Sequence, residues 1–256
     1  MSLDFTLDKY RELCKAAADS QYAVLGVKSY LTIQNLPPKF IILRHDVDRK
    51  PDKAVRMAEI EREYGLKSSY YFKYNQKVFQ PHLIRAVANA GHEIGYHYET
   101  LDKAKGDYEK AIQIFQEELK SFREICEVDT ICMHGNSLTR WVNRDLWQQY
   151  DFRDFGIIGE GYLSVPLDKM LYLSDTGRTW SGKHKVKDHV NKNNTILIKS
   201  TGDLIDVIRA GEADHICIVA HPNRWSKHFT YWLRQYAFDT TANLVKVLAK
   251  PLLSRS

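Results

Sequence analysis

Short, nearly continuous apolar runs recur along the chain and are separated by segments of mixed character. The runs cover residues 40–43, 69–72, 131–133, 196–198 and 216–220. Strands that are buried on both faces of a parallel sheet have this pattern, because neither of their faces meets solvent. The pattern therefore predicts a central parallel sheet.

Between these runs, apolar residues follow the i, i+3, i+4, i+7 spacing of a helix with one buried stripe. The spacing predicts helices over residues 54–64, 83–90, 112–122 and 204–208. Gly65 and Gly91 follow two of these helices, where C-terminal caps are expected. Alternating strands and helices predict an α/β fold, with the sheet either closed as a barrel or open and doubly wound.

A length of 256 residues suits one barrel domain over residues 1–256, since such a barrel typically needs about 250 residues. Residues 155–194 differ from the rest of the chain. They carry glycines at positions 156, 159, 161, 177 and 182 and have no helical periodicity. We expect them to form an irregular lid or hairpin insertion over one end of the barrel.

The net charge is +5, from 37 basic and 32 acidic residues dispersed along the chain. This balance is too mild and too mixed for a nucleic-acid-binding protein. Charged residues near the start, such as Asp4 and Asp8, argue against a signal peptide, and we expect a cytoplasmic protein without a membrane span. The four cysteines lack metal-site spacing and are interpreted as reduced thiols. We expect a small-molecule or carbohydrate substrate, and the oligomeric state is not predicted.

Ionisable side chains gather where the predicted strands end. Asp46 and Asp48 follow the first run, and because strand residues alternate, both side chains point to one face. Two carboxylates held together favour a bound cation or a shared proton. Residues 91–99 form a further predicted strand that ends in His97 and Glu99 on a shared face. Another predicted strand is followed by His134 and Asn136, and the last by His221 and Trp225. Catalytic groups of parallel α/β folds lie at these carboxyl ends.

These motifs resemble those of the polysaccharide deacetylase (NodB-like) family. The run from His45 to Asp48 is similar to the family's first motif, residues 91–97 are similar to its second, and His221 stands at the place of its late histidine. The resemblance spans residues 40–225 and implies an irregular (β/α)7-type barrel. It implies that Asp46 is the catalytic base, that Asp48 and His97 bind a metal, and that His221 is the general acid.

The chain departs from the family at one position. The second motif of the family carries a second metal-binding histidine four residues after the first, and here that position is Leu101. The third ligand is therefore expected from His134 or Glu99. We favour His134, because it ends its own strand beside the others.

The expected cofactor is a divalent ion held by mixed oxygen and nitrogen ligands. Zinc fits this set best, and cobalt, nickel and manganese also fit. Removing the proton-transferring Asp46 or His221 is expected to lower the rate by about two to four orders of magnitude.

Other side chains are candidates for substrate contact or support. Arg44 lies two residues before Asp46, so on a strand both side chains face the same side, and Arg44 is expected to orient Asp46. His45 faces the other way, and His92 is interpreted as structural. Asn136 and Trp225 lie beside the predicted strand ends. Within 155–194, the Trp180 ring could stack on a sugar, Asp175 could accept from its hydroxyls, and Arg178 adds a forked cation.

The sequence thus predicts a metal-dependent hydrolase that removes an acyl group, acetyl in the first instance, from the amide nitrogen of a sugar or glycan precursor. Two alternatives stay open: a non-catalytic glycan-binding barrel of the same fold, and a hydrolase of a non-sugar amide such as a cyclic imide or ureide. A glycosyltransferase would also use an Asp-x-Asp pair, but only 45 residues precede Asp46, too few for its nucleotide-binding fold.

Overall fold

The computed structural model describes residues 3–136, 139–180, 196–227, 229–237 and 239–241. Its helices are α1 (Leu7–Ala18), α2 (Val27–Thr32), α3 (Pro51–Glu63), α4 (Pro81–Asn89), α5 (Thr100–Lys103), α6 (Tyr108–Arg123) and α7 (Thr201–Ala210). Its strands are β1 (Ala23–Leu25), β2 (Phe40–Val47), β3 (Ser69–Lys73), β4 (Glu93–Tyr98), β5 (Thr130–Met133), β6 (Gly159–Glu160), β7 (Leu171–Ser174) and β8 (His215–Ala220). Short 3-10 helices are η1 (Asn143–Gln148), η2 (Phe152–Phe155), η3 (Leu167–Lys169) and η4 (Pro222–Arg224).

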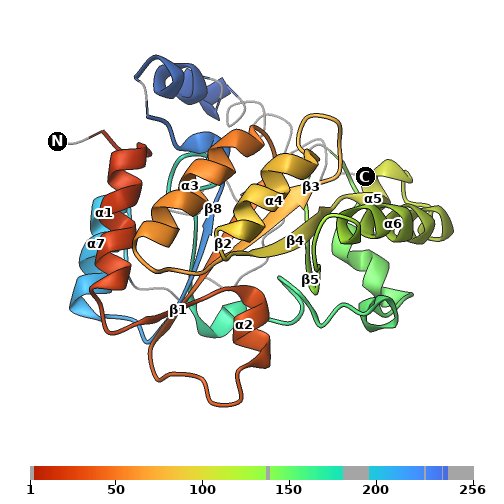
Figure 1. The fold of residues 1–256 in the computed structure, drawn as a ribbon, viewed down its shortest axis with the longest axis horizontal. Helices are drawn as coiled ribbons and strands as arrows, with labels where there is room; N and C mark the ends of the chain where they lie inside the picture. The colour runs from red at the N-terminus through yellow and green to blue at the C-terminus, as the bar shows by residue number, and fades with distance from the viewer. Residues whose placement is uncertain (1–2, 137–138, 181–195, 228, 238, 242–256) are drawn as a thin grey trace.

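The strands form one parallel sheet in the order β6-β5-β4-β3-β2-β8-β7, and β1 pairs with the start of β2. The sheet curls into a half-barrel whose outer face is covered by helices, among them α3 and α4 (Figure 1). Among the described residues β6 and β7 do not pair with each other, so these strands are the two edges. The α/β class and the parallel sheet are confirmed, and the half-barrel is compatible with a (β/α)7-type barrel.

Alternation along β2 shows how the sheet divides its side chains. Phe40 and Ile42 pack into the cluster on the concave face, whereas Ile41 and Leu43 pack into the cluster beneath the outer helices. Both faces are buried, which explains why the sequence shows a continuous apolar run. The same alternation directs Arg44 and Asp46 toward the concave face.

The predicted helix ends are found at the two expected glycines. Gly65 follows α3 with a φ of 68°, and Gly91 follows α4 with a φ of 93°. Both values lie in the left-handed region, where a side chain would be strained.

The expectation for residues 155–194 is corrected in part. Its described portion, 155–180, includes β6 and β7 and so supplies both edges of the sheet. Two short strands interrupted by η3 give no periodic signal, which is why the segment resembled an insertion. The remaining positions, 181–194, lie outside the described residues.

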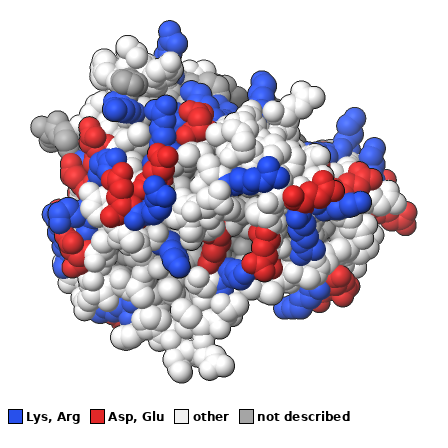
Figure 2. All heavy atoms as spheres, viewed as in Figure 1, with Lys and Arg blue, Asp and Glu red and all other residues white. Residues whose placement is uncertain are grey.

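Residues 196–198 are also not a strand, although Ile198 is buried in the core. In the part of the chain that the structure describes, we find no helix with both the length and the apolar character that crossing a membrane requires. The face of the molecule that carries α3 and α4 shows basic and acidic side chains interspersed (Figure 2).

Candidate functional site

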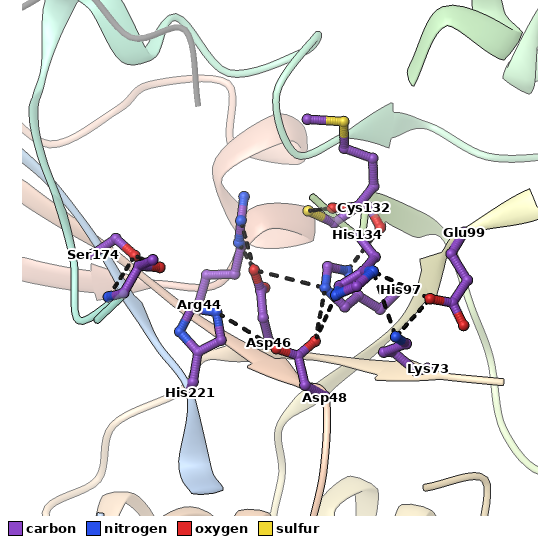
Figure 3. A network of polar contacts seen from close by, with 12 residues as sticks. Arg44, Asp46, Asp48, Lys73, His97, Glu99, Cys132, His134, Ser174 and His221 are labelled. Carbon is purple, nitrogen blue, oxygen red and sulfur yellow. Dashed lines mark hydrogen bonds and ion pairs between the residues drawn. The ribbon is translucent and has the colours of Figure 1, made fainter. Parts of the chain in front are cut away.

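Ionisable side chains from five strands or their ends meet at the carboxyl edge of the sheet, on its concave face (Figure 3). β2 leads to Asp46 and Asp48, and β4 leads to His97 and Glu99. The ends of β3, β5 and β8 supply Lys73, His134 and His221. Each side chain has the parity of an inward-facing residue on its strand, so the pleat of the sheet brings them together.

Asp46 is fixed by Arg44 from the same strand. Arg44 donates from Nε to Oδ1 at 3.0 Å and from Nη2 to Oδ2 at 2.9 Å, and both side chains are buried. Nη2 also donates to the hydroxyl of Tyr162 at 3.0 Å. Burial raises the pKa of Asp46, but Arg44, His97 and His221 outweigh it and leave the pKa lowered. Asp46 is therefore an ionised carboxylate at neutral pH, with its orientation set by a guanidinium.

Asp48 has different neighbours. Its Oδ1 lies 3.5 Å from Nε2 of His97 and 3.6 Å from Nε2 of His134, and its Oδ2 lies 3.9 Å from Nε2 of His221. Oδ1 is buried and has no hydrogen-bond partner among the described residues. Burial raises the pKa of Asp48, but His134, His97 and His221 hold it well below its usual value. An ionised carboxylate thus lies within reach of three imidazole nitrogens.

Nδ1 of each histidine contacts a polar group other than Asp48, and Nδ1 of His134 contacts two, because Nζ of Lys73 also lies 3.4 Å from it. Nδ1 of His97 donates to the carbonyl oxygen of Cys132 at 2.9 Å, Nδ1 of His134 lies 3.1 Å from Oε2 of Glu99, and Nδ1 of His221 donates to Oδ1 of Asp175 at 2.6 Å. In a neutral imidazole, a donating Nδ1 leaves a lone pair on Nε2. All three Nε2 atoms face the Asp48 carboxylate.

The pKa of His97 indicates that its surroundings favour a positive charge. Burial lowers the pKa, but the carboxylates of Asp46 and Asp48 outweigh it and leave it raised. These carboxylates stabilise a proton on Nε2, and they would equally stabilise a cation in its place.

Asp175 supports His221 from the protein interior. It is fully buried, and it accepts from the backbone N–H of His221 at 2.9 Å, from Nη1 of Arg224 at 2.8 Å and from Nε1 of Trp225 at 2.9 Å. Burial raises its pKa, but His221 and Arg224 outweigh it and lower it to about 2. Lys53 of α3 donates to three oxygens within residues 223–226 and ties down the segment that follows His221.

One buried group could hold a metal ion: Asp46, His97 and Cys132, whose ligand atoms all lie within 4.8 Å of one another. Asp48 and His134, expected as ligands together with His97, lie outside this group. Oδ1 of Asp48, however, has no partner among the described residues, while both oxygens of Asp46 already accept from Arg44. Separations of 3.5 and 3.6 Å also suit ligands that share one ion at about 2.0–2.2 Å.

Glu99, the alternative third ligand, does not face Asp48. Its Oε2 lies 2.5 Å from Nζ of Lys73 and 3.1 Å from Nδ1 of His134, on the far side of that ring. The geometry therefore favours His134 over Glu99 as a ligand.

Several expected substrate contacts are corrected. Trp180 is buried against Phe5 and Trp225, and its Nε1 donates to Thr201, so its ring faces are not open to a sugar. Trp225 is fully buried as well. Asp175 is also interior, as described above. Asp175 and Trp180 were expected as sugar contacts in an irregular segment, because the residues before Trp180 give no strand signal in the sequence.

Arg178 points toward the segment that follows His221 rather than into the site. Its Nη1 donates to the carbonyl oxygen of Arg224 at 3.1 Å, and its guanidinium lies over the Trp232 ring. Asn136 is half-buried just after β5, and its contact with a substrate stays a prediction.

His45 and His92, which were not predicted as site residues, lie on the outer face of the sheet. His45 is buried, stacks on Tyr70 and lies 2.7 Å from Oε1 of Glu61. Nε2 of His92 bonds to the carbonyl oxygen of Ala58. Both are packing residues, in agreement with their parity in the sequence.

Two residues at the site were missed in the sequence. Lys73 directly follows the run 69–72 and faces the same side of the strand as Tyr71, but it is not among the predicted site residues. Cys132 has the parity of His134, and its lack of cysteine spacing hid its position beside His97. The parity rule that located Glu99 would have located both.

Comparison with known proteins adds no relative: no family model matches the chain, and no curated protein matches it. The functional inference therefore depends on the site geometry and on the motif resemblance.

Proposed function

We propose that the protein is a metal-dependent hydrolase that removes an acyl group, acetyl in the first instance, from the amide nitrogen of a sugar or glycan precursor. One observation carries the proposal. Three imidazole Nε2 atoms face Asp48, whose Oδ1 is buried without a hydrogen-bond partner among the described residues. The likeness of residues 45–48 and 91–97 to deacetylase motifs supports the choice of an amide as substrate.

Asp48, His97 and His134 would hold the ion, and zinc is the proposed metal because it suits a mixed carboxylate and imidazole set. When bound, a divalent ion lowers the pKa of water toward neutrality and polarises an acyl carbonyl.

The proton transfers belong to the protein's own side chains. Asp46, ionised and oriented by Arg44, accepts a proton from the attacking water as a C–O bond forms. His221 donates a proton from Nε2 to the amide nitrogen as the C–N bond breaks, which releases a carboxylic acid and an amine. Asp175 holds Nδ1 of His221 and stabilises the imidazolium that this step requires.

Asp46→Asn and His221→Ala test these roles. Both variants should keep about one zinc per chain, because neither removes a proposed ligand, whereas Asp48→Asn should lose most of it. With N-acetylated sugars and nucleotide sugars as substrates, acetate release should fall by about two to four orders of magnitude in Asp46→Asn and His221→Ala. His82→Ala, at an exposed position on α4, is the matched control and should behave as wild type.

Two results would contradict the proposal. Undiminished turnover in Asp46→Asn would remove the base from the mechanism. A zinc-loaded wild type that releases no acetate from the panel, but opens a cyclic imide or ureide, would replace the sugar amide as the substrate class.

A further inference from the structure

We propose that Glu99 is a positioning residue that selects the metal-binding tautomer of His134, against the opposing influence of Lys73. The inference rests on the proposed function, because it assumes that His134 binds the ion through Nε2. Neither Glu99 nor Lys73 is assigned a catalytic step above.

The Glu99 carboxylate is directed to the site by the backbone. Glu99 follows β4 and precedes α5 as its N-cap residue, yet its side chain makes no capping hydrogen bond. Its side chain instead faces the same side of the sheet as that of His97 and points toward Nδ1 of His134 and Nζ of Lys73 (Figure 3). An ionised carboxylate beside the Lys73 ammonium can only accept hydrogen bonds.

Nδ1 of His134 has two neighbours with opposite requirements. Oε2 of Glu99, at 3.1 Å, is an acceptor and requires a proton on Nδ1. Nζ of Lys73, at 3.4 Å, is a donor and requires a lone pair there. If Nδ1 donates to Glu99, the lone pair of Nε2 faces Asp48, 3.6 Å away, and can bind an ion. If Nδ1 accepts from Lys73, Nε2 carries the proton and cannot.

The geometry favours Glu99 in this competition. Its oxygen is nearer to Nδ1 than Nζ of Lys73 is, and Nζ is itself held 2.5 Å from the same oxygen. Carboxylates that hold the outer nitrogen of a metal-binding histidine typically change metal affinity by about 10–100-fold when they are removed. At this site Lys73 should increase the loss of metal affinity, because it would remain beside Nδ1 of His134 as a hydrogen-bond donor.

The test measures the zinc dissociation constant of the full-length protein by competition with a chromophoric chelator. Glu99→Met removes the acceptor and should weaken zinc binding by about 10–100-fold. Glu99→Gln keeps an amide oxygen that can accept from both neighbours, and it should recover most of the affinity. The double variant Lys73→Met/Glu99→Met removes the opposing donor and should bind zinc more tightly than Glu99→Met alone.

If Glu99 serves only as the ion-pair partner of Lys73, the variants should rank differently in zinc affinity. In that case the double variant would bind no better than Glu99→Met, and Glu99→Gln would be as weak as Glu99→Met. Either result overturns the inference. Glu127→Met, an exposed position at the opposite end of the sheet, is the control for replacing a glutamate by methionine and should leave affinity unchanged.

The two proposals fail in different ways. If wild type and Glu99→Met bind zinc equally tightly, the positioning role is wrong and the metal site stands. If wild type binds no zinc, the proposed function and this inference are both overturned. Cobalt substitution gives a second measurement: loss of His134 from the coordination shell in Glu99→Met should change the visible d–d absorption, and Glu99→Gln should retain the wild-type spectrum.

Discussion

Asp46 and Asp48 are chemically identical side chains two residues apart on one face of the sheet, but they have different neighbours. Arg44 holds both oxygens of Asp46, whereas Asp48 faces histidine nitrogens and has an oxygen without a partner among the described residues. The period of a strand predicts that the two carboxylates share a face. It does not predict their neighbours, because those come from strands far away in the chain.

The Arg44–Asp46 pair leads to a prediction about stability. Arg44→Met leaves the buried Asp46 carboxylate without its cation, and the usual cost of an uncompensated buried charge is about 3–5 kcal/mol. The free energy of unfolding, measured by urea denaturation, should fall by that amount. Arg153→Met, which breaks an exposed ion pair, is the control and should change it little. A loss for Arg44→Met as small as the control's would show that Asp46 does not depend on this guanidinium.

Single residues also show where prediction from the sequence ends. The positions of His97, His134 and His221 followed from the ends of apolar runs, a local signal. Asp175 was expected to accept hydrogen bonds from sugar hydroxyls, yet it is fully buried against His221. Its role depends on β7 lying beside β8, a pairing between segments more than 40 positions apart.

Among the elements, those with a clear apolar run or helical stripe were predicted, whereas helix α1 and the strands β1, β6 and β7 were not. β2, β3, β4, β5 and β8 and four of the helices gave clear periodic or continuous apolar signals. β1 has three residues and β6 has two, too few to show a period. Such strands are stabilised by the partner that they pair with, so their own sequence carries little information.

Helix α3 covers the sheet behind the site and contributes a buried carboxylate. Glu61 lies 2.7 Å from Nε2 of His45, and it accepts from the hydroxyls of Tyr10, Tyr70 and Ser68. Burial raises the pKa of Glu61, but His45 and its other partners outweigh it and lower it to about 2, from an ordinary 4.5. Because His45 precedes Asp46, this network holds the strand that carries the proposed base.

The lowered pKa predicts a pH dependence of stability. As the pH falls below about 4.5, the unfolded chain binds a proton at Glu61 before the folded protein does. Glu61 therefore contributes stability above that pH and loses it as the pH approaches 2. Glu61→Gln should remove this part of the slope and lower the free energy of unfolding at pH 7 by about 3–5 kcal/mol.

Urea denaturation between pH 2.5 and 7 measures this effect. Glu59→Gln, at an exposed position on the same helix, is the matched control and should keep the wild-type slope. If Glu61→Gln also keeps that slope, the buried carboxylate does not titrate as its surroundings indicate.

At the scale of the whole molecule, the curled sheet explains why distant residues share one site. Each parallel strand delivers its last side chains to the same edge, and the curl turns those ends toward one another (Figure 1). Sequence patterns predicted the parallel sheet, but they left open whether it closes or stays open. That choice depends on its edges, β6 and β7, which are two of the strands that the sequence did not reveal.

The central claim is that Asp48, His97 and His134 hold one divalent ion. A crystal structure of zinc-loaded protein, with anomalous diffraction at the zinc edge, tests it most directly. The account predicts one zinc at about 2.0–2.2 Å from an Asp48 oxygen and from Nε2 of both histidines. A zinc bound instead by Asp46, His97 and the Cys132 sulfur, or no zinc at this edge of the sheet, would contradict it.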